Sequence, residues 1–159
     1  MPSPPFKNAP LLTAEQLQAR IGEFYTAIDE FNDGYYFESH ETLEDLWMVT
    51  PLPERDLFQA IIQLAAAMVH HARGEYPGIL KLLDAAADKL RGFLPSAVGV
   101  DVAALLSDVE RTRSEIVALG PTRVSEWDEA RAPRISVDAH DGPELRRRSA
   151  RPRGNAQRP

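Results

Sequence analysis

The sequence predicts an all-α fold, a compact bundle of about five helices followed by a disordered basic tail. Hydrophobic residues recur at intervals of three and four along most of the first 120 positions, as in helices with one buried face. Glycine and proline interrupt this pattern repeatedly and leave short connections. No long stretch alternates between polar and apolar residues, and RISVD at 134–138 is the one candidate strand.

The composition indicates one domain. A chain of 159 residues with 43% hydrophobic content can bury a substantial core. It contains no cysteine, which excludes disulfides and thiolate metal sites. The first residues lack the pattern of a secretory signal, and no segment reaches about 18 uncharged apolar residues. We therefore expect a soluble cytoplasmic protein that has no membrane partner.

The helical bundle domain is expected at residues 13–120, after an irregular leader at 1–12. Thr13 and Gln16 match a capping box, which predicts a first helix over 13–30. Asn32-Asp33-Gly34 ends this helix, and a second helix is expected over 34–48, before the prolines at 51 and 53.

Three further helices are expected at 54–73, 77–93 and 101–120. The first of them is the most hydrophobic and ends before Gly74, whereas Pro77 suits the first turn of the next. Asp101 is a suitable N-cap for the last helix, which Gly120-Pro121 terminates.

The composition changes after Pro121. Residues 1–120 carry 9 basic and 18 acidic side chains, whereas residues 121–159 carry 9 arginines and 6 acidic side chains. Trp127 and Ile135 predict that the extended segment 121–142 packs partly on the bundle. Residues 143–159 have almost no apolar content and are expected to be a disordered basic tail. The acidic body disfavours nucleic acid as a partner except through this tail.

The segment FESHETLE, which begins at Phe37, concentrates residue types that bind metals or transfer protons. On a helix, His40, Glu41 and Glu44 lie next to an aromatic face that contains Phe37 and Trp47. His40 and Glu44 are spaced so that both can reach one ion, and imidazole with carboxylate suits zinc, manganese or iron. Glu41 and Glu44 are the candidate catalytic bases, in a metal-assisted or a metal-free hydrolytic site.

The following helix carries a polar stripe beside its apolar face. The stripe consists of Arg55, Gln59, Gln63 and His70. Antiparallel helices joined by a short turn pack side by side, so the stripe is expected to meet the acidic face of the preceding helix. His70 is the candidate third metal ligand. The candidate contacts for a small-molecule ligand are Glu38, Trp47, Arg55, Gln59 and Gln63.

The same residues have a structural interpretation. Buried polar groups are normally hydrogen-bonded, and a closed network of these side chains would fix the register of the two helices. The protein would then be a non-enzymatic interaction module that contacts a partner through its basic tail. The complete zincin and di-iron motifs are absent. His71 is expected on the surface, and His140 in a mobile segment.

The stretch FNDGYYFESHETLEDLW, followed by RDLFQAIIQLAAAMVHHARGEYPGILKLLDAAADKL, resembles the small helical family known as domain of unknown function 309. The resemblance covers residues 24–94. It implies a compact all-helical fold and assigns no activity. The family pattern falls on Phe31, Gly34, Glu38, His40, Glu41, Glu44, Trp47, Gln59, Gln63 and His70.

Overall fold

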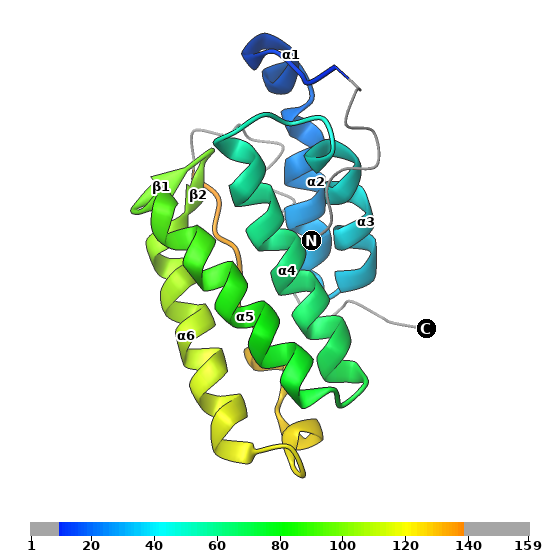
Figure 1. The fold of residues 1–159 in the computed structure, drawn as a ribbon, viewed down its shortest axis with the longest axis vertical. Helices are drawn as coiled ribbons and strands as arrows, with labels where there is room; N and C mark the ends of the chain where they lie inside the picture. Colours follow the sequence, from blue (N-terminus) through cyan, green and yellow to red (C-terminus); the bar gives the residue numbers. More distant parts are fainter. Residues whose placement is uncertain (1–9, 139–159) are drawn as a thin grey trace.

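Six α-helices carry the regular structure of the computed structural model, which describes residues 10–138 (Figure 1). They are α1 (Ala14–Ala19), α2 (Ile21–Asn32), α3 (Tyr36–Trp47), α4 (Glu54–Ala72), α5 (Tyr76–Leu90) and α6 (Val102–Leu119). The predicted all-α class is confirmed. Residues 1–9 of the leader, His140 and the predicted tail at 143–159 lie outside the described residues.

Helix α4 is the centre of the bundle. It lies between α3 and α5 and runs opposite to both (Figure 1). Phe58 of α4 stacks on Phe24 of α2 with ring centroids 4.7 Å apart, and both side chains are fully buried. Because its neighbours cover most of its circumference, α4 reaches solvent mainly along one stripe, which contains Arg55, Gln59 and His70. Among the described helices, none has the length and apolar character needed to cross a membrane.

The first predicted helix is divided into two. Thr13 and Gln16 form the predicted capping box, and Thr13 Oγ1 accepts from the Gln16 N–H at 3.1 Å. The helix then breaks at Arg20, where φ is −104° and ψ is 6°. The backbone N–H of Leu12 donates to the Val49 carbonyl at 2.8 Å. This bond ties the start of α1 to the α3–α4 connection, so α1 does not continue along the axis of α2.

A small hairpin follows α5 and the 3₁₀ turn η1 (Arg91–Phe93). Its strands β1 (Ser96–Ala97) and β2 (Val100–Asp101) pair antiparallel, and Val100 also bridges to Val137. Val137 lies in RISVD, the candidate strand. The sequence does not predict the hairpin because strands of two residues produce no alternating pattern. Asp101 then caps α6 as predicted, with its Oδ1 accepting from the Ala104 N–H at 3.0 Å.

We refer to residues 121–138 as the C-terminal segment, and it packs along the bundle. It contains the 3₁₀ turns η2 (Val124–Glu126) and η3 (Glu129–Arg131). Trp127 and Ile135 are buried in it. The side chain of Asn32 and the backbone of Ile135 exchange two hydrogen bonds of 2.8 Å. The C-terminal segment therefore packs on a helix that precedes it by about 100 residues in the chain, and it contributes buried side chains to the core.

His71 is buried, and the expectation that it lies on the surface is wrong. It is 8% exposed, its Nε2 lies 3.1 Å from the Val124 carbonyl oxygen, and its ring meets Trp127 edge-on at 5.1 Å. A carbonyl oxygen only accepts, so Nε2 carries the proton. The C-terminal segment covers this side of α4, and the periodicity of α4 alone carries no information about that cover.

Candidate functional site

The face of α3 that carries the predicted site lies at the edge of its buried surface. The core-facing residues of this helix are Tyr36, Ser39, Leu43, Leu46 and Trp47. His40 and Glu44 are half-buried beside them, whereas Glu41 is exposed further round the helix. Positions 40, 44 and 47 have the i, i+4, i+7 spacing of one helical face. Side chains of these residues can therefore act together.

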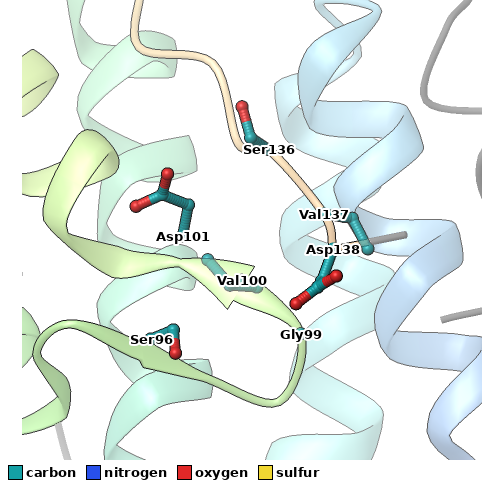
Figure 2. Close-up of a pocket in the computed structure, with 7 residues that line it drawn as sticks. All are labelled: Ser96, Gly99, Val100, Asp101, Ser136, Val137 and Asp138. Carbon is teal, nitrogen blue, oxygen red and sulfur yellow. The ribbon is translucent and has the colours of Figure 1, made fainter. Parts of the chain in front are cut away.

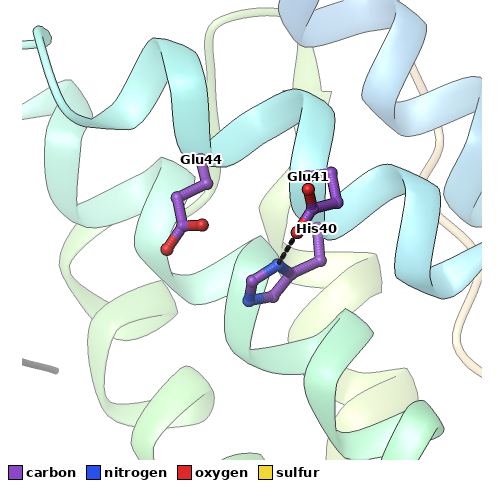
Figure 3. A group of neighbouring side chains, drawn as sticks. All are labelled: His40, Glu41 and Glu44. Carbon is purple, nitrogen blue, oxygen red and sulfur yellow. Dashed lines mark ion pairs between the residues drawn. The ribbon is translucent and has the colours of Figure 1, made fainter.

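His40, Glu41 and Glu44 come together on one side of α3 (Figure 3). One donor atom from each lies within 4.8 Å of the other two. His40 Nδ1 is 4.0 Å from Glu41 Oε2, which is too long for a hydrogen bond. Within residues 10–138, no other three histidine or acidic side chains approach one another in this way. We call these three residues the His-Glu-Glu group.

Phe37 does not belong to the buried aromatic face, in contrast to the prediction. It is 59% exposed, whereas Trp47 is 4% exposed. Because α2 and α4 both pack on α3, they bury the side that carries Trp47, and Phe37 lies on the solvent side with Glu41. Glu38 is also exposed, in the first turn of α3. The His-Glu-Glu group therefore borders solvent rather than an apolar pocket.

Two polar atoms on the face of His40, Glu44 and Trp47 are buried without a hydrogen-bond partner. They are His40 Nδ1 and Trp47 Nε1. A buried donor or acceptor left unpaired costs about 1–3 kcal/mol. This face can recover that free energy by binding a group that satisfies the two atoms.

Arg55 connects the polar stripe of α4 to this face. Its Cζ lies 4.6 Å from the centre of the Trp47 ring, a cation–π contact. The contact joins the end of α3 to the beginning of α4. It places a positive charge one helical turn beyond Glu44.

The rest of the stripe turns away from α3. Residues spaced four apart advance by about 40° around a helix, so the stripe winds across the outer side of α4. At its far end His70 contacts α5, because a Cβ added to Gly78 would lie 2.5 Å from His70 Cδ2. Gln63 lies two such steps after Arg55, toward α5. It is 7% exposed, and its Oε1 has no hydrogen-bond partner.

The structure does not bring His70 to the His-Glu-Glu group. Its Nδ1 donates to the Ala66 carbonyl at 3.0 Å, and its Nε2 lies 3.5 Å from Glu75 Oε1. His70 is about 22 Å along α4 from Arg55, whereas His40 is about 10 Å along α3 from Trp47. Residue spacing in α4 gives the direction of His70 around the helix, but it does not give its height along the axis relative to α3.

The His-Glu-Glu group and the polar stripe of α4 do not form a closed hydrogen-bonded network. In the part of the chain that the structure describes, no hydrogen bond joins the His-Glu-Glu group to Arg55, Gln59 or Gln63. Gln59 is half-buried on the outer side of α4. Among these described residues, only His40, Glu41 and Glu44 are close to one another, and they form no hydrogen bond with the polar stripe of α4.

A second feature, a hollow of about 310 Å³, was not predicted from the sequence (Figure 2). Its lining consists of Ser96, Gly99, Val100, Asp101, Ser136, Val137 and Asp138. The carboxylates of Asp101 and Asp138 point in different directions in Figure 2, and Asp101 already caps α6. The two carboxylates of the hollow therefore do not converge on one point. The hollow also ends at the last described residue.

One family model matches the chain. The family is described as Domain of unknown function (DUF309), and the match covers residues 24–82. This segment includes the His-Glu-Glu group, Trp47 and Arg55. No curated protein and no solved structure matches the chain.

Proposed function

We propose that this chain, which carries a DUF309 family domain at residues 24–82, binds one divalent transition metal ion at the His-Glu-Glu group of α3. Zinc, manganese and iron are the metals that suit an imidazole with carboxylates. Ligand atoms at about 2.1 Å from zinc lie about 3.4 Å from one another in tetrahedral geometry. The donor atoms of the group lie within 4.8 Å of one another, so small side-chain rotations suffice.

The observation that carries this proposal is the unpaired state of a buried nitrogen. His40 Nδ1 is shielded from solvent and neither donates nor accepts a hydrogen bond. The carboxylates of Glu41 and Glu44 nevertheless lie close to the His40 ring. In a structural network these groups would be paired with one another. A metal ion satisfies an unprotonated imidazole nitrogen and neutralises the two negative charges at the same time.

The ligand set favours a catalytic rather than a structural metal. Structural zinc sites are closed by four protein ligands, whereas catalytic sites keep a position for water or substrate. A site with at most three ligands from one side of α3, at the edge of its buried surface, would leave such a position. If His40 and Glu44 held the ion, Glu41 would be the side chain left to act as general base, and the ion would supply Lewis-acid activation of water. Hydrolysis of a small molecule is therefore the reaction class that we propose.

Metal titration of protein without a histidine tag tests the proposal. We expect one Zn²⁺, Mn²⁺ or Fe²⁺ ion per chain, and stabilisation of about 2.7 kcal/mol at a metal concentration 100 times the Kd. His40→Ala and Glu44→Gln should weaken metal binding at least about tenfold. Both side chains are half-buried, so these variants should still fold.

Two matched substitutions serve as controls. His70→Ala removes a histidine whose side chain is 33% exposed, against 27% for His40. Glu38→Gln removes a carboxylate from α3, the helix that carries Glu44. Neither should change metal affinity. If metal binding is lost in His70→Ala and kept in His40→Ala, the ligand set is wrong. If no metal binds and none shifts the melting temperature, the protein is better explained as the non-enzymatic interaction module.

A further inference from the structure

Arg55 differs from most other arginines of the described chain because its guanidinium forms no ion pair within 4.0 Å. Six arginines form ion pairs with acidic side chains: Arg20, Arg91, Arg111, Arg113, Arg123 and Arg131. Arg134 donates to the carbonyl of Asn32. Among the arginines of residues 10–138, only Arg55 and Arg73 have side chains that form neither an ion pair nor a hydrogen bond. Arg73 is exposed at the end of α4, whereas Arg55 is half-buried.

Trp47 holds the guanidinium of Arg55 in place. The ring is 4% exposed, and Arg55 Cζ lies 4.6 Å from its centre. Stacking on an aromatic ring uses the flat face of a guanidinium and leaves its edge N–H groups available for hydrogen bonds. Arg55 is therefore a positioned donor whose edge is unused, rather than a mobile surface charge.

The guanidinium is positioned near the end of α3 that follows the His-Glu-Glu group. Trp47 follows Glu44 by three residues, which makes them neighbours on the surface of α3. Arg55 contacts Trp47, yet it forms no ion pair with Glu44 within 4.0 Å. A negatively charged group between Arg55 and a metal ion at His40 and Glu44 would find attraction on both sides.

From this arrangement we infer that Arg55 binds an oxyanion, a phosphate or carboxylate group, of the ligand whose other part reaches the metal ion. The inference rests on the proposed metal site and identifies the class of ligand that the site accepts. Arginine suits this role because its planar edge donates two parallel hydrogen bonds to an oxyanion. Trp47 Nε1, which is buried and has no hydrogen-bond partner, belongs to the ring on which this guanidinium stacks.

The charges of the site make anion and metal binding interdependent. Glu41 and Glu44 repel an anion as long as no cation neutralises them, so the oxyanion should bind well only to the metal-loaded protein. By thermodynamic linkage the oxyanion must then raise the affinity for the metal by the same factor. This reciprocity separates a joint site from two unrelated surface sites.

Calorimetric titrations with Mn²⁺, phenyl phosphate and benzoate test the inference. We expect phenyl phosphate or benzoate to bind the full chain with Mn²⁺ present and at least about tenfold more weakly without it. A preference for phenyl phosphate assigns the ligand to the phosphate esters, and a preference for benzoate assigns it to the carboxylates. Titration into buffer with Mn²⁺ corrects for complexes that form without protein.

Arg55→Gln is the deciding variant, and Arg73→Gln is its control on the same helix. Arg55→Gln should weaken oxyanion binding by about 10- to 100-fold and change Mn²⁺ affinity, measured without oxyanion, by less than about twofold. Arg73→Gln should change neither. Arg55→Lys keeps the charge and loses the flat paired donors, so it should restore only a small part of the affinity.

Failure of the inference differs from failure of the metal site. If Mn²⁺ binds and the oxyanion binds equally to wild type and Arg55→Gln, the role of Arg55 is refuted and the metal site stands. Full recovery in Arg55→Lys also contradicts the inference, because it shows that only general charge matters. If Mn²⁺ does not bind, the metal proposal and the inference built on it both fall.

Discussion

The two tryptophans of the chain lie in polar clusters of opposite kinds. Trp127 of the C-terminal segment donates its Nε1–H to Glu115 Oε1 at 3.0 Å. Glu115 also accepts hydrogen bonds from Arg111 and Arg131. Trp47 is as deeply buried, and its Nε1 has no partner, although Arg55 stacks on its ring and His40 and Glu44 precede it on α3 at helical spacing. One cluster is closed and the other is open.

The closed cluster explains how the C-terminal segment is attached to α6. The hydrogen bonds from Arg131, Trp127 and Arg111 lower the pKa of Glu115 to about 2, against an ordinary value of 4.5. Its negative charge is satisfied within the fold, and nothing remains for a ligand to pair with. In the open cluster the same residue types leave their donors and acceptors unused. The difference teaches that hydrogen-bond saturation, rather than charge density, separates a structural cluster from a candidate binding site.

Removal of the Glu115 side chain should have the largest effect on stability. Glu115→Ala leaves the buried Trp127 N–H unpaired and Arg131 without its anion, whereas Arg111 keeps its pair with Asp108, and the loss should cost about 2–3 kcal/mol. Denaturant unfolding measures this change. Glu110→Ala on the same helix is the control, because Glu110 has only an exposed pair with Arg91 and should cost less than about 0.5 kcal/mol. Equal losses in the two variants would contradict the closed cluster.

The two tryptophans allow a direct comparison. Trp127→Phe and Trp47→Phe remove similar volume, but only the first breaks a hydrogen bond of the indole. Trp127→Phe should therefore be the more destabilising of the two by about 1–2 kcal/mol in metal-free protein. Chemical denaturation of both variants at neutral pH gives the difference. If Trp47→Phe costs more, Trp47 Nε1 has a partner and its cluster is not open.

Acid should remove the contribution of the Glu115 charge. Because folding lowers the pKa of Glu115, its charge stabilises the protein above pH about 4.5, and this stabilisation is lost as the pH falls toward 2. Glu115→Gln should cost about 1 kcal/mol at pH 7, since a charged hydrogen bond becomes neutral, and the difference from wild type should shrink at acid pH. A difference that stays constant from pH 7 to pH 2.5 would show that the charge is not involved.

The sequence was sufficient for the all-α class and for helices α3 to α6. Periodicity predicts α3 to α6 because the buried face of each helix repeats along its own residues. Periodicity fails where a feature of a helix depends on residues from another part of the chain. The break at Arg20 depends on the hydrogen bond from Leu12 to Val49, and the burial of His71 depends on its contact with Trp127.

The candidate site shows the same limit on a smaller scale. The spacing of His40 and Glu44 predicts that they share a face, and the structure brings Glu41 to them as well. Spacing within α4 did not show that its stripe winds from α3 at Arg55 to α5 at His70. The spacing within one helix predicts the direction in which a side chain points. Its neighbours also depend on how far the two packed helices are shifted along their axes.

The two indole N–H groups also provide the most direct test of the metal site. In a proton–nitrogen NMR spectrum of the full chain, substoichiometric Mn²⁺ broadens signals near the bound ion. We predict that the Trp47 indole signal and the amides around His40 and Glu44 disappear, while the Trp127 indole signal remains. Broadening centred on the Glu115 cluster, or no selective broadening at all, would contradict the conclusion that the open cluster of α3 is the metal site.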